Sequence, residues 1–333
     1  MEYQANEQRY EAMIYRRAGA SGLKLPLISL GLWHNFGTND DYSNMKRMCF
    51  TAFDRGVTHF DIANNYGPLP GSAEENFGRI LREEFAGYRD EMLISTKAGY
   101  TMWPGPYGDW GSRKYLLASL DQSLKRLGLP YVDVFYHHRM DKDTPLEESM
   151  LALDTAVKSG RALYAGLSNY DSATLRKATA ILKELHCPFV LNQVRYSIFD
   201  RHIEPDGLEE TAAETGFGII AFSPLAQGLL TDRYIKGIPE NSRIGKGGPF
   251  LRPEQLTEEK LGQIRALNEI AQSRGQTLSE MALSWVLRSG RVTSVLIGAS
   301  SPEQIIQNLG ILTAPAFSED ELVRIDALSG VTH

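Results

Sequence analysis

Short runs of β-branched and apolar residues alternate with longer helical patterns along almost the whole chain, and no other feature restricts the fold as strongly. Between the runs, apolar residues recur at spacings of three and four, as they do from Leu116 to Leu127. This alternation predicts a parallel α/β fold, and eight runs match the strand number of a (β/α)8 TIM barrel. The expected strands are residues 27–32, 58–61, 92–97, 132–138, 164–168, 190–193, 218–222 and 294–297.

A doubly wound open sheet is the rival architecture, and its first strand usually leads into a glycine-rich phosphate-binding turn. Here the first run continues Leu30-Gly31-Leu32-Trp33-His34 without a G-x-G-x-x-G pattern, which favours the barrel. Residues 13–17 and 23–25 flank a Gly- and Ser-rich turn and predict an N-terminal β-hairpin, at about 13–25, that closes the bottom of the barrel. Residues 225–252 predict a long loop at the C-terminal face, and residues 1–333 are expected to form one domain.

Composition excludes several function classes. The chain carries 35 basic and 41 acidic side chains, a net charge of −6 and a pI near 5.7, which argues against nucleic-acid and anionic-membrane partners. No apolar run approaches the roughly 18 residues of a membrane span, and residues 1–17 lack the apolar core of a signal peptide. Cys49 and Cys187 cannot form a disulfide framework. We therefore expect a soluble cytoplasmic protein.

Charged and polar side chains stand at the carboxyl ends of the expected strands, where barrel enzymes carry out their chemistry. Strand 58–61 ends at Asp61, strand 92–97 at Lys97 and strand 132–138 at His138, and Tyr66 follows the first of these ends. Because a strand interior tolerates charge poorly unless it is paired, these residues predict a single paired cluster.

Such a cluster has the groups that the reduction of a carbonyl requires. An ammonium close to a phenol lowers the pKa of the tyrosine, and a carboxylate keeps that ammonium protonated. The tyrosine then donates a proton to the oxygen that gains negative charge, while the histidine positions the same oxygen. None of these side chains supplies a hydride, so a redox cofactor is required.

These residues resemble the catalytic pattern of the aldo-keto reductases. The resemblance spans roughly residues 13–329 and, through residues 100–103 and 107–113, is strongest for the bacterial L-glyceraldehyde 3-phosphate reductases, near the potassium-channel β-subunit branch. The matching motifs, in chain order, are Gly31-Leu32-Trp33, Asp61-Ile62-Ala63-Asn64-Asn65-Tyr66-Gly67, Ser95-Thr96-Lys97, His138-Arg139, Gly166-Leu167-Ser168-Asn169, Ser223-Pro224-Leu225-Ala226 and Gly298-Ala299-Ser300-Ser301.

The resemblance implies a role for each catalytic candidate. Tyr66 is expected to be the proton donor, and Lys97 the residue that lowers its pKa. Asp61 is expected to be the partner of Lys97, and His138 to orient the carbonyl.

The adjacent pair His137 and His138 requires a choice, because successive strand residues face opposite sides of a sheet. The family's spacing, with the catalytic histidine directly before Arg139, selects His138. No metal site is expected at this pair, since strand neighbours diverge and a third ligand is not evident.

The resemblance also implies NADP(H), bound in an extended form across the barrel mouth. Ser168, Asn169 and Gln193 are expected at the nicotinamide amide, and Phe222 is the strand-seven candidate for stacking on the ring. Ser301 and Pro302 predict a helix N-terminus, which attracts phosphate, and Arg243 is a candidate for the 2′-phosphate, so NADPH is favoured over NADH. The other expected contacts are Trp33, Asp61, Ser223, Pro224, Leu225, Ala226, Gln227, Gly228, Arg233, Gly298, Ala299, Ser300, Gln304, Gln307 and Asn308.

An aromatic-rich segment beside Lys97 suits the shielding of a small carbonyl substrate from water. Guanidinium groups suit phosphate recognition, so two arginines are candidates for a substrate phosphate. The expected substrate contacts are Trp33, Tyr66, Trp103, Trp110, Arg113, His138 and Arg139.

The predicted activity is the NADPH-dependent reduction of small aldehydes, such as L-glyceraldehyde 3-phosphate and methylglyoxal. Two alternatives stay open: a nucleotide-binding regulatory protein of the channel β-subunit type with little turnover, and an isomerase that uses Lys97 as a Schiff base. The intact His138 favours turnover, because channel subunits of this branch commonly carry Asn there. Relatives in the branch form tetramers or octamers, which implies a homo-oligomer.

Overall fold

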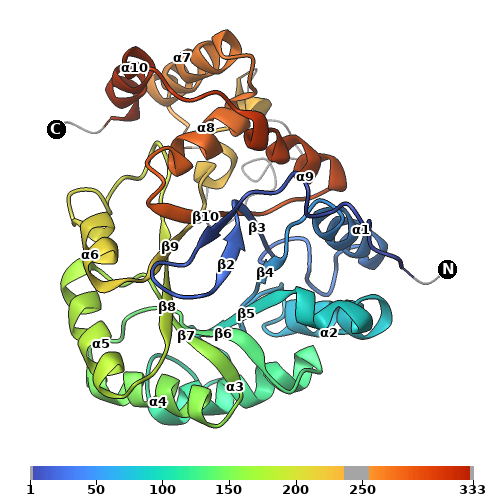
Figure 1. Cartoon of the computed structure of the whole chain (residues 1–333), viewed down its shortest axis with the longest axis vertical. Helices are drawn as coiled ribbons and strands as arrows, with labels where there is room; N and C mark the ends of the chain where they lie inside the picture. The colour runs from blue at the N-terminus through green and yellow to red at the C-terminus, as the bar shows by residue number, and fades with distance from the viewer. Residues whose placement is uncertain (1–2, 236–253, 255, 331–333) are drawn as a thin grey trace.

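The computed structural model describes residues 3–235, 254 and 256–330, and its central feature is a closed barrel of eight parallel strands. Each strand pairs with the next along the chain, and the last pairs back onto the first (Figure 1). The predicted (β/α)8 TIM barrel is confirmed, and every expected strand is present. The barrel strands are β3 (Ile28–Gly31), β4 (His59–Asp61), β5 (Leu93–Ala98), β6 (Val132–His137), β7 (Ala162–Ser168), β8 (Phe189–Arg195), β9 (Gly218–Phe222) and β10 (Val292–Ile297).

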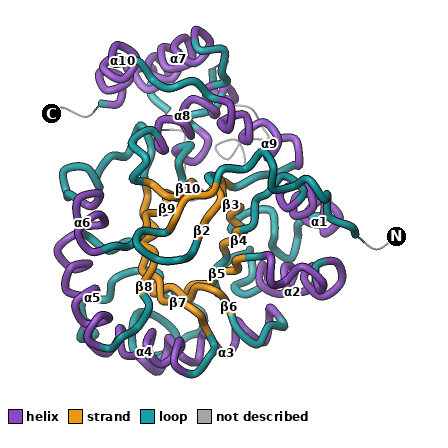
Figure 2. Tube along the Cα trace, in the orientation of Figure 1, coloured by secondary structure: helices purple, strands orange, loops and turns teal. Residues whose placement is uncertain are grey.

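A layer of helices surrounds the strands, and apolar side chains between the two layers form the main core (Figure 2). At least one α-helix follows each barrel strand, and two follow β9 (α7 and α8) and β10 (α9 and α10). The helices are α1 (Tyr42–Phe53), α2 (Ser72–Glu84), α3 (Arg113–Leu127), α4 (Leu146–Lys158), α5 (Ser172–Glu184), α6 (Leu208–Thr215), α7 (Glu258–Ser273), α8 (Leu278–Leu287), α9 (Pro302–Asn308) and α10 (Glu319–Ser329), with short 3-10 turns η1 (Ala86–Glu91), η2 (Ala226–Gly228), η3 (Asp232–Tyr234) and η5 (Leu309–Thr313). Among the described residues, none of the helices is both long and apolar enough to cross a membrane.

Helix α3 shows how local sequence sets these elements. The Ser112 hydroxyl accepts a hydrogen bond from the Tyr115 amide at 3.2 Å and so caps the first turn. The helix ends at Gly128, whose φ of 69° is the left-handed conformation that glycine adopts without steric cost. Leu116, Leu120, Leu124 and Leu127, at spacings of three and four, are buried against the barrel.

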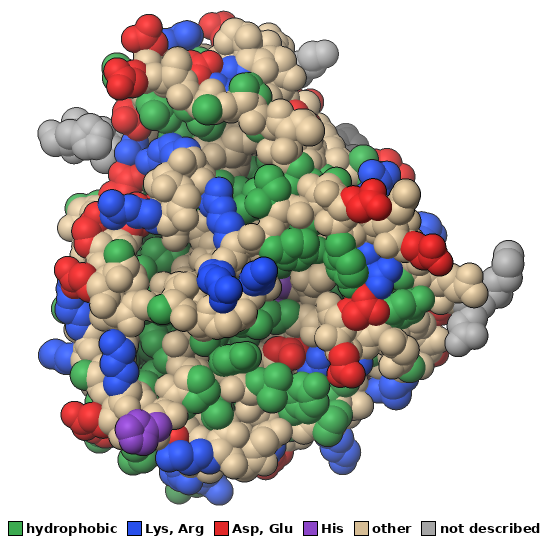
Figure 3. Space-filling view, viewed as in Figure 1, with side chains coloured by type: hydrophobic (Ala, Val, Ile, Leu, Met, Phe, Trp, Pro, Cys, Tyr) green, Lys and Arg blue, Asp and Glu red, His purple; other side chains and the backbone are tan. Residues whose placement is uncertain are grey.

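The N-terminal hairpin consists of β1 (Tyr15–Arg17) and β2 (Lys24–Pro26), within the predicted span. It crosses the end of the barrel at which the strands begin (Figure 1). The Ala20 amide donates to the Gly216 carbonyl just before β9, and Ala18 and Leu25 are fully buried among side chains from inside the barrel. Figure 3 shows this face, with hydrophobic side chains between charged ones at its middle. The hairpin closes the bottom, so the other end is left for chemistry.

The interior of the barrel has two chemically different sides. Strands β6 to β9 contribute mainly apolar side chains that pack with the hairpin: Val134, Tyr136, Val190, Leu191 and Ile220. Strands β10, β3, β4 and β5 contribute fully buried polar ones: Ser294, Ser29, His59, Asp61, Ser95 and Lys97. A buried polar group is costly unless it is hydrogen-bonded, so the polar side must be internally paired.

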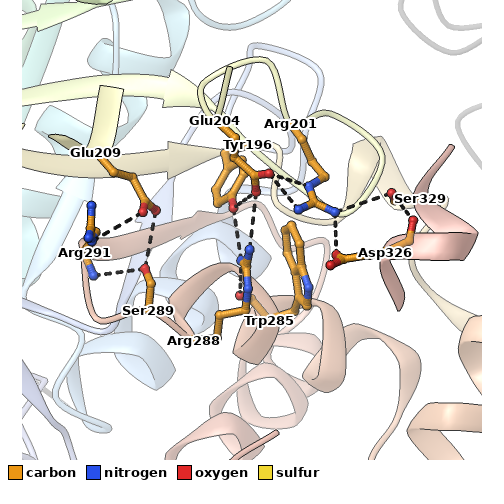
Figure 4. Close-up of polar contacts among 10 residues, drawn as sticks. All are labelled: Tyr196, Arg201, Glu204, Glu209, Trp285, Arg288, Ser289, Arg291, Asp326 and Ser329. Atoms are coloured by element: carbon orange, nitrogen blue, oxygen red, sulfur yellow. Dashed lines mark hydrogen bonds and ion pairs between the residues drawn. The ribbon is translucent and has the colours of Figure 1, made fainter. Parts of the chain in front are cut away.

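A network of ion pairs fastens the last helix, α10, to the segment after β8 (Figure 4). The Arg201 side chain, 4% exposed, donates from Nη1 to Asp326 at 2.6 Å and from Nε to Glu204 at 2.8 Å. Glu204 also accepts from the Tyr196 hydroxyl at 2.6 Å, and Arg288 donates to that hydroxyl at 3.0 Å. The network joins segments that are distant in the sequence, because Arg201 and Asp326 are separated by 125 residues and Tyr196 and Arg288 by 92.

Candidate active site

The cluster is built around a fully buried ion pair between Lys97 on β5 and Asp61 at the end of β4. Lys97 Nζ binds Asp61 Oδ2, while Oδ1 accepts from Ser95 Oγ at 2.6 Å and from Gln193 Nε2 at 3.0 Å. Burial lowers the pKa of Lys97, and the Asp61 charge opposes that shift. Each oxygen of the carboxylate therefore has a donor, which is the condition under which a buried charge is tolerated.

Tyr66 lies in the turn after β4, with its ring centre 5.2 Å from Lys97 Nζ. The turn is fixed by the Tyr66 amide, which donates to the Ala63 carbonyl at 3.1 Å. We predicted that the ammonium lowers the pKa of this phenol, but in the free protein the net shift of the Tyr66 pKa runs upward. Burial raises the pKa of Tyr66 well above 10, and the negative charge of Asp61 adds to the effect. The Lys97 charge is engaged by Asp61, so the phenol keeps its proton.

His138 follows β6 and faces the tyrosine: the two ring centres are 6.0 Å apart at an interplanar angle of 70°. Burial lowers the pKa of His138 well below 6.5, with Lys97 adding to the shift, so the imidazole is neutral near neutral pH. Its Nδ1 is buried without a hydrogen-bond partner among the described residues. Gly99 makes room for it, since a Cβ there would stand 2.9 Å from the Cβ of His138.

His137 points the other way, into the helical layer. Its Nδ1 lies 2.7 Å from the Tyr170 hydroxyl, and Gly111 approaches the opposite edge of its ring. Burial lowers the pKa of His137 to about 4. The alternation of strand residues thus separates the two histidines, with only His138 near Tyr66.

The aromatic segment between β5 and α3 is held in place by Arg139. Its Nε donates to the Gly99 carbonyl at 2.7 Å and its Nη2 to Asp109 at 2.8 Å. The guanidinium carbon also lies 3.6 Å from the Trp110 ring centre and 4.2 Å from that of Tyr100. Arg139 is therefore close to the cluster, and its charge is partly balanced by Asp109.

The other expected substrate contacts are divided. Trp33 lies beside Tyr66, with ring centres 6.0 Å apart. Trp103 packs against the Tyr115 ring of α3 at 5.3 Å. Arg113 is turned away: its Nη1 donates to the Leu151 carbonyl at 2.9 Å and to Thr155 at 2.8 Å, both on α4. The expected phosphate contact by Arg113 does not match this geometry.

The residues expected at the nicotinamide border the cluster. Gln193, in the second half of β8, is bonded to Asp61. Asn169 follows β7, and its Nδ2 donates to the His138 carbonyl at 3.0 Å and to Ser168 Oγ at 3.2 Å. Strands β7 and β8 therefore place amide and hydroxyl groups around one edge of the site.

The segment after β9, expected to cover the pyrophosphate, folds back on itself. Phe222 ends the strand, and the left-handed residues Ser223 (φ 51°), Ala226 (φ 46°) and Gln227 (φ 59°) follow it. Gln227 Oε1 is buried without a partner among the described residues. Pro224, Leu225 and Gly228 belong to the same turn, Arg233 is exposed in η3, and Arg243 lies outside the described residues.

The residues expected at the adenosine end follow the neighbouring strand, β10. Gln304 Oε1 accepts from the Ser300 amide at 2.8 Å, and Asn35 donates to the Ala299 carbonyl at 2.8 Å. Gly298 precedes them, and on α9 Gln307 is exposed and Asn308 buried. Pro302 is the first residue of α9, as predicted.

Backbone strain marks the same end of the barrel. Non-glycine residues with positive φ cost free energy and persist where the surroundings hold them. Within the described ranges there are seven, and six of them lie in segments that follow barrel strands at the carboxyl end: Asn35, Trp110, Asn169, Ser223, Ala226 and Gln227. The strained turn after β9 and the unpartnered Gln227 oxygen are compatible with a turn that binds an extended polar ligand such as a dinucleotide.

Sequence reasoning missed two residues that contact this cluster. Ser95 is bonded directly to Asp61, and His59 is bonded to Ser95 at 2.9 Å. Both were accessible to pattern analysis, because Ser95 and Lys97, like His59 and Asp61, are two positions apart on a strand and share a face. We instead interpreted His59 as structural.

Known proteins match the chain over nearly its full length. The Aldo/keto reductase family model matches residues 27–329. The chain is 56% identical over 329 residues to the L-glyceraldehyde 3-phosphate reductase of Escherichia coli K12, covering 98% of this chain and 95% of the relative. The protein of the same name from Escherichia coli O157:H7 matches with the same identity and coverage.

Proposed function

The chain belongs to the aldo/keto reductase family and is an oxidoreductase, and from that premise we propose that it uses NADPH to reduce small aldehydes. The proposed substrates are L-glyceraldehyde 3-phosphate, for which the relatives are named, and smaller carbonyls such as methylglyoxal. The observation that carries the proposal is the buried Lys97–Asp61 pair with the rings of Tyr66 and His138 beside it.

The reduced nicotinamide supplies the hydride that the carbonyl carbon accepts. Trp33, Ser168, Asn169 and Gln193 would hold this ring, and the turn at residues 222–228 would hold the phosphates. Arg233, with residues 298–300, Gln304, Gln307 and Asn308, would hold the adenosine end. Arg243 stays a proposed contact of the 2′-phosphate.

The side chains of the cluster divide the proton chemistry. The Tyr66 phenol, which keeps its proton because its pKa is raised, donates a hydrogen bond to the aldehyde oxygen and then transfers the proton as negative charge grows. Neutral His138, with a hydrogen on Nε2, donates to the same oxygen and fixes its position. Lys97 stabilises the phenolate that remains, and Asp61 holds Lys97 in place.

The surroundings of the cluster suit a small, water-sensitive reaction centre. Trp33 lies against Tyr66, and Tyr100 meets the His138 ring edge-on at 4.6 Å. These rings, with Trp103 and Trp110 in the adjoining segment, restrict both the size of the substrate and the access of water. Arg139 is the proposed contact of a substrate phosphate.

The test is loss of NADPH absorbance with DL-glyceraldehyde 3-phosphate and with methylglyoxal, in the wild type and in Tyr66→Phe. We expect turnover that falls by about 10²- to 10⁴-fold in the variant, the range for loss of a general acid, with NADPH affinity retained. Turnover that survives in Tyr66→Phe would show that Tyr66 is not the proton donor. Tight NADPH binding without turnover in the wild type would favour the regulatory alternative.

A further inference from the structure

A chain of buried hydrogen bonds runs away from the catalytic carboxylate across the polar side of the barrel. Ser95 Oγ donates to Asp61 Oδ1 at 2.6 Å, and the same Oγ lies 2.9 Å from His59 Nε2. On the other edge of the imidazole, Nδ1 lies 2.8 Å from Ser29 Oγ, which lies 2.7 Å from Ser294 Oγ. All five side chains are fully buried, and they come from the adjacent strands β10, β3, β4 and β5.

The carboxylate fixes the direction of every bond in this chain. A hydroxyl has one hydrogen to donate, and an ionised carboxylate only accepts. Because Ser95 gives its hydrogen to Asp61, it must accept from His59, so the imidazole carries its hydrogen on Nε2. Nδ1 is then an acceptor and takes the hydrogen of Ser29, which in turn accepts from Ser294. Burial lowers the pKa of His59 to about 4, which is consistent with the neutral ring that this pattern requires.

We propose that His59 is a positioning residue for the reaction, which acts through Ser95 to hold the Asp61 carboxylate in the orientation that directs Lys97 toward Tyr66. This inference rests on the proposed function. Asp61, through Ser95, sets the tautomer of His59, and the two serines beyond it supply the hydrogen that the unprotonated Nδ1 accepts. Ser95 and Gln193 occupy Asp61 Oδ1, which leaves Oδ2 for Lys97, whose Nζ lies 5.2 Å from the Tyr66 ring centre.

Disruption of this hydrogen-bond chain at His59 would alter catalysis without removing a contact to the substrate. Both ring nitrogens of His59 are bonded inside the barrel, to Ser95 and Ser29, so neither is left to bind a substrate. A purely structural histidine would instead affect folding, substrate affinity and turnover together. A fall in kcat without a change in KM therefore distinguishes a positioning role of His59 from a purely structural one.

The first experiment compares His59→Leu, which removes both polar atoms, with His59→Gln, which restores an amide donor toward Ser95. We expect kcat in His59→Leu to fall by about 10- to 100-fold, the range for misplacement of a reacting group. KM for the aldehyde and the Kd for NADPH should change by less than about twofold, and His59→Gln should recover most of the loss. Unchanged kcat in His59→Leu would overturn the proposal, as would equal losses in both variants.

Tyr136→Phe is the matched control inside the same barrel. The Tyr136 hydroxyl is buried without a hydrogen-bond partner among the described residues, and its ring centre lies 5.7 Å from Lys97 Nζ. Its loss removes a polar atom from the barrel interior without breaking the chain, and kcat should stay within about twofold of the wild type. A loss in this control as large as that in His59→Leu would contradict a specific role for His59.

The second experiment reads the tautomer directly by NMR of protein labelled with ¹⁵N-histidine, with the His59 signals assigned by their absence in His59→Gln. We expect a protonated Nε2 and an unprotonated Nδ1 between about pH 6 and about pH 8. A hydrogen on Nδ1 in an enzyme that turns over would overturn this inference alone. A wild-type protein that oxidises no NADPH with any aldehyde would overturn the proposed function, and the positioning role with it.

Discussion

The backbone of Gly166 on β7 lies directly against the ring of Tyr136 on β6. A Cβ at position 166 would stand 2.5 Å from two carbons of that ring and 2.9 Å from Val134. The barrel strands are bonded on both sides, so neither backbone can retreat without loss of register. The glycine is thus what allows the large aromatic side chain inside the barrel, beside Lys97.

We expect Gly166→Ala to destabilise the fold by about 2 to 3 kcal/mol, because overpacking of a tightly packed core forces strain. Gly262, on the exposed face of α7, is the matched control, since a Cβ there meets nothing within 4 Å. Gly262→Ala should stabilise by about 0.5 to 1 kcal/mol, the usual gain in a helix interior. Denaturant unfolding measures the free energy of unfolding of both variants. Equal changes in the two would contradict the explanation that a Cβ at position 166 collides with Tyr136.

The two arginines proposed from the sequence should now behave differently. Arg139 lies beside the cluster, whereas Arg113 is bonded to α4. With L-glyceraldehyde 3-phosphate, Arg139→Ala should raise KM by about tenfold or more, in keeping with the loss of a charge-assisted contact, and Arg113→Ala should leave KM unchanged.

Methylglyoxal, which has no phosphate, separates phosphate binding from the positioning of the aromatic segment. If Arg139 binds phosphate, its loss should affect the phosphorylated aldehyde far more than methylglyoxal. Equal losses with both substrates would mean that Arg139 acts by holding Asp109 and Trp110 in place.

The fold was predictable because its signal is local and repeated. Each strand run is short and apolar, each is followed by a helical pattern, and the parity of strand residues separates His137 from His138. The resemblance to a known family then supplied the roles of Tyr66 and Lys97.

Tertiary partners were not predictable, because they depend on groups distant in the chain. The carbonyl that binds Arg113 belongs to Leu151, 38 residues away, and nothing near Arg113 signals that contact. The upward direction of the Tyr66 pKa shift was not predictable for a related reason. The neighbouring ends of the expected strands indicated a nearby ammonium paired with Asp61, but only the structure shows that burial dominates the pKa of the phenol.

Buried His137 should make stability depend on pH. Its pKa is lowered to about 4 in the folded protein, whereas an unfolded histidine titrates near about 6.5. The unfolded state therefore binds more protons between these values, so stability is full above about pH 6.5 and falls as the pH drops toward 4. The slope from one histidine is about 1.4 kcal/mol per pH unit.

Replacement of His137 should make the free energy of unfolding less dependent on pH. We expect the free energy of unfolding of His137→Gln to fall less steeply than that of the wild type between about pH 6.5 and about pH 5, by the contribution of one proton. Chemical denaturation at a series of pH values measures both slopes. Because His59 and His138 also have lowered pKa values, part of the dependence should persist in the variant, and identical slopes would exclude His137 as a contributor.

The pH dependence of aldehyde reduction follows from the opposite shifts of Tyr66 and His138. Burial raises the pKa of the Tyr66 phenol above 10, so the proton that it donates is lost only at strongly basic pH. Burial lowers the pKa of His138 below 6.5, so the neutral imidazole that donates from Nε2 is lost only at acidic pH. We expect kcat/KM for methylglyoxal to be level from about pH 6.5 to about pH 9. A fall in kcat/KM with a midpoint near pH ~8 would instead mean that the charge of Lys97 lowers the phenol pKa in the working enzyme. If that fall is absent in Tyr66→Phe, it is caused by the titration of Tyr66.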